Sequence, residues 1–154
     1  MPPYDSRPLT HVQRALCDSA LLRAHRPDGA ADVARNHDGA ELLALLARTT
    51  AIPGYLAASL VTPDGAKRLI QLCRALSQVA TDPRAAAELH ALRASAHLAS
   101  AQAGMAELHA EAALTLQPAH PVAQRLLKQL RGQPGPAQLL SIAYRAYTTP
   151  QAGA

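Results

Sequence analysis

The sequence predicts an all-α fold of about seven helices and no sheet. Composition is the first reason: 35 Ala and 24 Leu stand against eight Val and Ile together and no Phe or Trp. Helix formers therefore dominate, and strand formers are nearly absent. The second reason is that Pro and Gly turns bound the periodic apolar segments. With so few large aromatics the helices have to pack Leu against Ala, which favours closely crossed antiparallel pairs stacked in a row.

Residues 1–50 are expected to form the N-terminal helices. Pro8 opens the first one, whose apolar residues repeat on one face. After a Pro-Asp-Gly turn comes a short helix that Asp28 caps. Asp38 and Glu41 have the spacing of a capping box before the densest Leu run of the chain, so we expect this third helix in the core.

Residues 53–131 are expected to hold helix pairs. A short helix ends at the Thr-Pro-Asp-Gly turn of residues 62–65, and a well-patterned helix follows it to Ala80. In the next pair Asp82 is the N-cap and Pro83 takes the first helical position, where its missing N–H costs nothing. The second helix of this pair carries four apolar residues at helical spacing: Met105, Leu108, Ala112 and Leu116.

The C-terminal part is expected to end in a capping helix at 136–147. A Gly- and Pro-rich linker at 132–136 separates it from an amphipathic helix that begins at Pro121. The segment 148–154 has no apolar periodicity and is expected to fray. The whole chain, 1–154, suits one domain that is long enough to bury its own core.

Residues 82–121 resemble a tetratricopeptide repeat over about 35 residues. Ala94 stands at the small-residue position of the family's first helix, and Pro118 stands at its closing proline. His90 and His97 stand where the family has large aromatics. Three small residues occupy the contact positions of the second helix: Ala106, Ala110 and Ala113. The resemblance implies a short superhelix with these alanines at a close helix crossing, and a generic helical hairpin is the alternative.

In such repeats the first helices of stacked pairs line an open concave face that binds partners. The resemblance therefore implies a protein–protein interaction module, either an adaptor or a small chaperone. The groove-facing residues that it implies are Glu88, Ala91, Ser95 and Leu98. Because this face is small and mildly apolar, the expected partner is an apolar or helical segment of another protein.

A second hypothesis comes from the charge distribution. The chain has a formal net charge of +4, yet residues 1–50 are neutral and no acid follows Glu111. Arg125, Lys128 and Arg131 share one side of an amphipathic helix in this acid-free part. The alternative is thus a basic helical protein that binds nucleic acid or an acidic partner through its C-terminal third. Steep loss of binding with added salt would favour this alternative.

Three of the seven histidines, His90, His97 and His109, fall in one predicted helix pair. His90 and His97 are two turns apart, about 10 Å along the helix axis, which is too far for one ion without other ligands. No HxxxH or HExxH pair accompanies them. We expect these histidines to be half-buried polar spacers at the helix crossing, and a histidine-based metal or cofactor binder is the remaining alternative.

No enzyme activity, metal or cofactor is expected. The chain has no nucleophile elbow and no Gly-rich phosphate loop. Glu107 and Glu111 are one helical turn apart, which is typical of a solvated face. Cys17 and Cys73 form no ligand motif and are expected to be reduced and buried.

The sequence also carries an expectation for location. Its first ten residues lack a signal pattern, and the longest apolar run, 42–47, is too short to span a bilayer. A cytoplasmic protein without a membrane partner is therefore expected, and the Ala- and Arg-rich composition suggests a bacterial source. The sequence does not indicate an oligomeric state.

Overall fold

The computed structural model describes residue 5 and residues 7–148, so most of the expected frayed tail lies outside the described residues. Over this part the chain forms nine α-helices, one 3-10 helix and no strand, which confirms the all-α prediction. The expected number of about seven is too low, although both short helices, α2 and α4, lie where the sequence indicated them. The elements are α1 (His11–Arg23), α2 (Pro27–Arg35), α3 (His37–Arg48), α4 (Ala51–Ala57), η1 (Ala58–Val61), α5 (Pro63–Ser77), α6 (Pro83–Ala99), α7 (Ala103–Leu116), α8 (Pro121–Arg131) and α9 (Pro136–Thr148).

Local sequence chemistry explains where the helices begin. Five of the described helices start at a proline. Asp82 caps α6 as expected, because its carboxylate accepts a hydrogen bond of 2.8 Å from the Arg84 N–H. The first helix starts later than the expected Pro8. Thr10 and Gln13 form a capping box there: the Thr10 N–H donates to Gln13 Oε1 (2.9 Å), and the Gln13 N–H donates to Thr10 Oγ1 (3.1 Å).

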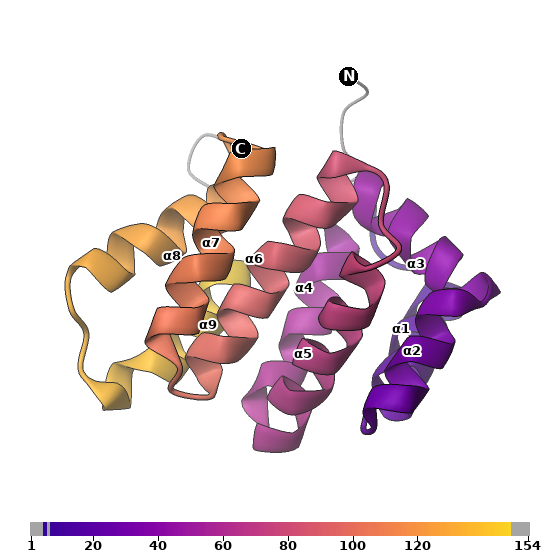
Figure 1. Ribbon diagram of the computed structural model, residues 1–154, viewed down its shortest axis with the longest axis horizontal. Coiled ribbons are helices and arrows are strands. Elements are labelled where there is room, and N and C mark those ends of the chain that lie inside the picture. Colours follow the sequence, from indigo (N-terminus) through magenta and orange to yellow (C-terminus); the bar gives the residue numbers. More distant parts are fainter. Residues whose placement is uncertain (1–4, 6, 149–154) are drawn as a thin grey trace.

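Helix α6 is the centre of the molecule. It runs between α5 and α7, and it also packs against α3, α4, α8 and α9 (Figure 1). Residues on all of its sides are buried, as expected for a helix that has small or apolar residues all round. A first helix of a stacked repeat would instead leave one side open to a groove. The described residues therefore give no evidence for a tetratricopeptide-like repeat.

The pair α6 and α7 has the most extensive interface in the described chain, and it lies near the middle of Figure 1. Small side chains let the two helices approach closely. The four alanines expected at this crossing are all fully buried: Ala94, Ala106, Ala110 and Ala113. Their predicted burial is confirmed.

The outer face of α7 carries the larger apolar side chains. Met105, Leu108 and Leu116 are 39%, 57% and 41% exposed. The apolar series that indicated this helix in the sequence therefore lies on its solvent side, while the alanines and His109 face α6. Spacing alone identifies a helix but does not say which of two apolar faces is buried.

Candidate functional site: a basic cleft between α8 and α9

The linker between α8 and α9 turns the chain back on itself. Gln133 has a φ of 50°, a left-handed conformation that is uncommon for a residue other than glycine. Gly132 and Gly135 lie on either side of it, and Pro136 then starts α9. As a result α9 packs against α8, α6 and α4. This return places side chains of α8 opposite side chains of α9.

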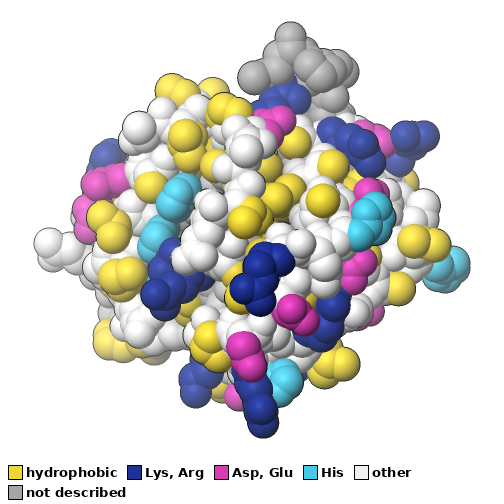
Figure 2. Space-filling model, turned by 45° about the vertical axis from the view of Figure 1, so that its right-hand side comes forward, with side chains coloured by type: hydrophobic (Ala, Val, Ile, Leu, Met, Phe, Trp, Pro, Cys, Tyr) yellow, Lys and Arg dark blue, Asp and Glu magenta, His cyan; other side chains and the backbone are white. Residues whose placement is uncertain are grey.

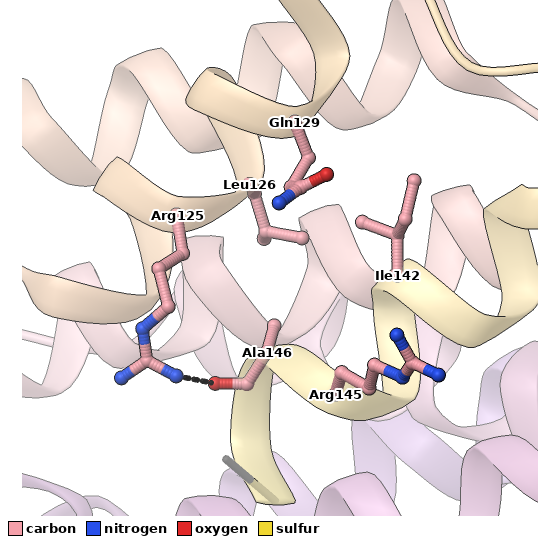
Figure 3. A pocket seen from close by; sticks show the side chains of 6 residues that line it. All are labelled: Arg125, Leu126, Gln129, Ile142, Arg145 and Ala146. Atoms are coloured by element: carbon pink, nitrogen blue, oxygen red, sulfur yellow. Dashed lines mark hydrogen bonds between the residues drawn. The ribbon is translucent and has the colours of Figure 1, made fainter. Parts of the chain in front are cut away.

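A cleft of about 280 Å³ lies between these two helices (Figure 3). Ile142 from α9 gives it a partly exposed apolar floor, beneath which Leu126 from α8 is fully buried. Arg125 and Arg145 lie on opposite sides of the view in Figure 3. The Arg125 guanidinium donates a hydrogen bond of 2.8 Å to the Ala146 carbonyl, which ties α8 to α9. The cleft thus combines apolar contact area with cationic hydrogen-bond donors.

The sequence segment that forms the cleft carries charges of one sign. Eleven bases and eleven acids lie at or before Glu111, whereas the rest of the chain holds four bases and no acid. The whole formal charge of +4 therefore belongs to the C-terminal part. The face formed by the N-terminal helices instead shows Lys and Arg beside Asp and Glu (Figure 2).

The predicted basic face is divided in the structure. Arg125 is half-buried and bonded to α9, so it belongs to the cleft. Lys128 and Arg131 are exposed to solvent instead. Sequence reasoning missed Arg145, Gln129 and Ile142 as cleft residues; the only signal for them was the absence of acids in this part of the chain.

The four residues predicted to line an exposed groove lie inside the molecule instead. Ala91, Ser95 and Leu98 are fully buried, and the Glu88 side chain is only 12% exposed. Their expected exposure is wrong because other helices cover α6 on every side. They are not available to a partner in this structure.

Glu88 has a specific buried neighbour. Its Oε1 lies 3.0 Å from Nε2 of His120, which is 1% exposed. His120 is the N-cap of α8, and its Nδ1 accepts a hydrogen bond from the Ala123 N–H. Because Nδ1 is an acceptor, Nε2 is the ring nitrogen that carries the proton beside the carboxylate. No local pattern indicates this pair, since its members are far apart along the chain.

The three histidines stack on one another between α6 and α7. The His109 ring centroid is 5.3 Å from that of His90 and 5.4 Å from that of His97. Burial lowers the pKa of all three, that of His109 to about 4. Burial penalises the charged ring, so the stack is neutral at physiological pH. The histidines pack as polar spacers at the crossing, as the sequence indicated.

The stack is not arranged to hold a metal. Near-parallel rings do not direct their nitrogen lone pairs at one point. His97 uses Nε2 to accept a hydrogen bond from Arg93 and Nδ1 to donate one of 2.6 Å to Gln102. Across residues 5 and 7–148, no group of three or more His, Cys, Asp or Glu could hold an ion.

The two cysteines are buried and free, as predicted. Burial raises the pKa of each thiol to about 12. The reactive thiolate form is therefore absent near neutral pH, and neither cysteine is a candidate nucleophile.

Comparison with known proteins gives no assignment: no family model, curated protein or solved structure matches this chain. Among the described helices, none combines the length and the apolar character needed to cross a bilayer. The geometry of the chain itself is therefore the basis for assigning a function.

Proposed function

We propose that this protein is a protein–protein interaction module that binds an acidic, partly apolar segment of a partner in the cleft between α8 and α9. It would serve as an adaptor or a small chaperone. One observation supports this most strongly. The cleft has an apolar floor between two guanidinium groups, and it lies in the part of the chain that holds all of the net charge.

The two kinds of surface would contribute differently. Fully burying one Leu-sized side chain of the partner against Ile142 and the neighbouring cleft wall contributes about 1.5–3 kcal/mol. A solvent-exposed ion pair with Arg145 adds only about 0.2–1 kcal/mol. Apolar contact would therefore supply most of the affinity, and the basic charge would select acidic partners and speed their association.

Nucleic acid is the competing ligand for the same charge. Phosphate binding by a few basic side chains is sequence-independent and falls steeply with salt. It makes no use of an apolar floor, and only one of the two Tyr residues of α9, Tyr144, is well exposed for base stacking. The cleft therefore favours a peptide over a nucleic acid.

Binding of labelled peptides to the full chain tests the proposal. The probe is a six-residue peptide with two central Leu residues flanked by Glu, and its controls carry Lys for Glu or Ser for Leu. The Glu/Leu peptide should bind, and both controls should bind at least about fivefold more weakly. Arg145→Gln should weaken binding, whereas Arg14→Gln on exposed α1 is the matched control and should not.

Two results would contradict the proposal. One is equal peptide affinity in the Arg145→Gln and Arg14→Gln variants. The other is a single-stranded oligonucleotide that binds more tightly than the peptide at physiological salt and loses affinity in the Arg145→Gln variant. That outcome would make the nucleic-acid hypothesis the correct one.

A further inference from the structure

A second cavity lies beside the cleft and has a different chemistry. It has a volume of about 190 Å³ and is formed by residues of α4, α6, α8 and α9 with the segment that leads into α8. Arg125 and Ala146 line both cavities. Glu88, His120 and Tyr147 line only the second one, which we call the Glu88 cavity.

Glu88 brings a negative charge to this cavity in a buried position. A buried carboxylate requires several hydrogen-bond donors to replace water. Nε2 of His120 lies 3.0 Å from Oε1, yet it is not aligned for a hydrogen bond. Because Nδ1 of His120 accepts from the Ala123 N–H, the ring carries its proton on Nε2, beside the carboxylate. Glu88 thus places a carboxylate in the wall of the cavity.

Tyr147 adds a hydroxyl with no partner. Its Oη is buried, and it makes no hydrogen bond with the described residues. Burial, with the nearby charge of Glu88, raises the pKa of Tyr147 well above its usual value, so the phenol keeps its proton. A buried hydroxyl without a partner is costly to the folded state. The protein chain thus places this polar atom at a cavity where a bound molecule could satisfy it.

Arg125 supplies the opposite charge at the same cavity. Its hydrogen bond to the Ala146 carbonyl fixes the guanidinium relative to α9. A guanidinium is well suited to binding a carboxylate. The rest of the lining includes apolar or small residues such as Pro53, Gly54 and Val122. The volume is below the range of about 300–1,000 Å³ that is typical of drug-sized ligands, so the occupant has to be small.

We propose that the Glu88 cavity binds a small zwitterion of the α-amino-acid type. Its ammonium group lies against Glu88 and the Tyr147 hydroxyl, and its carboxylate lies against Arg125. This inference is separate from peptide binding in the cleft, although Arg125 belongs to both. It places a positive charge against the carboxylate and gives the orphan hydroxyl a partner.

Calorimetric titration of the full chain tests this with three probes of similar size. L-alanine has both charges, L-lactate has a hydroxyl in place of the ammonium group, and L-alaninamide lacks the carboxylate. We expect L-alanine to bind at least about tenfold more tightly than either of the others. Binding should be weakened at least about tenfold in Glu88→Gln and several-fold in Tyr147→Phe.

Arg145→Gln is the matched control, because Arg145 lines the cleft but not the Glu88 cavity. It should leave L-alanine binding unchanged while it weakens the acidic peptide, which separates the two proposals. Tyr147→Phe removes one hydroxyl and no charge, so it keeps the test valid even if Glu88→Gln fails to fold. Absence of L-alanine binding, equal binding of L-alaninamide, or an unchanged affinity in Tyr147→Phe would each overturn the proposal.

Discussion

The chain up to Glu111 and the chain after it differ in the balance of their acidic and basic residues. In the first part acids and bases are equal in number, and several are paired, as Arg7 is with Asp5 and Arg23 with Asp38. At distances beyond about 8 Å at physiological salt, the electrostatic fields of the two charges in such a pair largely cancel. The sequence after Glu111 holds four bases and no acid, so the net charge behind the long-range field of the molecule comes from this part.

The two parts also differ in packing. With the exception of Leu126 in α8, the fully buried Leu and Ile side chains lie between Leu42 and Leu98, that is, in α3 to α6. The part after Glu111 adds α8 and α9, with the cleft between them and the Glu88 cavity beside it. Most of the stabilising core and the candidate binding surfaces therefore come from different stretches of the sequence.

The core of the first part should respond most strongly to substitution. Leu72 is fully buried, so Leu72→Ala should lower the free energy of unfolding by about 2–5 kcal/mol. Urea unfolding followed by circular dichroism measures it. Leu22→Ala, at a side chain that is 62% exposed, is the control and should change stability far less. Equal losses in the two variants would show that the core is not concentrated where the large side chains are buried.

The tight crossing of α6 and α7 should be the next most sensitive place. Ala110 is fully buried there, and adding bulk to a packed contact costs about 1–3 kcal/mol. Ala110→Leu should therefore lower the melting temperature measurably. Ala44→Leu on the exposed side of α3 should not. An unchanged melting temperature for Ala110→Leu would mean that the helices do not cross closely at this residue.

The histidine stack predicts a pH dependence. An unfolded chain protonates His109 near pH 6.5, whereas the folded chain does so only near pH 4, because burial lowers its pKa. Between these values the unfolded state binds more protons. The contribution of His109 to stability is therefore fully present above about pH 6.5 and is lost as the pH falls toward 4. After allowance for solvent screening, we expect His109 to account for a loss of about 1–2 kcal/mol.

Urea titrations at several pH values measure this loss. His109→Phe keeps a flat ring in the stack but has no proton to gain, so its stability should vary less between about pH 6.5 and 4 than that of the wild type. His37→Gln at an exposed position is the control and should keep the wild-type slope. Identical slopes in all three proteins would show that the stack does not resist protonation.

Exposed charges should matter least for stability. Arg14→Gln in α1 and Arg131→Gln at the end of α8 should each change the free energy of unfolding by less than about 0.5 kcal/mol. The two variants should differ in peptide association instead. Only Arg131→Gln should slow the association rate of the acidic peptide, measured by stopped flow at low salt. Equal association rates would show that the field is not concentrated in the C-terminal part.

Much of the fold could be predicted because helix boundaries are local. Pro63, Pro83, Pro121 and Pro136 each start a helix, and side-chain caps accompany three of them. The scarcity of strand formers was enough for the fold class. Packing was harder to predict, since α7 has two apolar faces and only the tertiary structure decides that the alanine face is buried.

The candidate sites were harder still to predict, because they are formed by contacts between residues that are far apart in the sequence. Glu88 was expected to face a partner in an open groove, yet it meets His120 inside the molecule. Nothing in the local sequence of either residue indicates that contact. The cleft needs α9 to return onto α8, and a Gly- and Pro-rich linker shows that the chain turns without giving the angle. The missing acids after Glu111 and the basic side of the helix that begins at Pro121 were the sequence signals that pointed to this region.

Helix α6, at the centre of the molecule, limits the ways in which the chain can fold and evolve. A row of repeats can gain or lose a member at its end and can unfold one unit at a time. Here six other helices share one inner helix, from both earlier and later parts of the sequence. Removing α9 would uncover α6, although α9 is the last helix in the sequence. Such a molecule is expected to fold as one cooperative unit, and its length cannot be changed by adding modules.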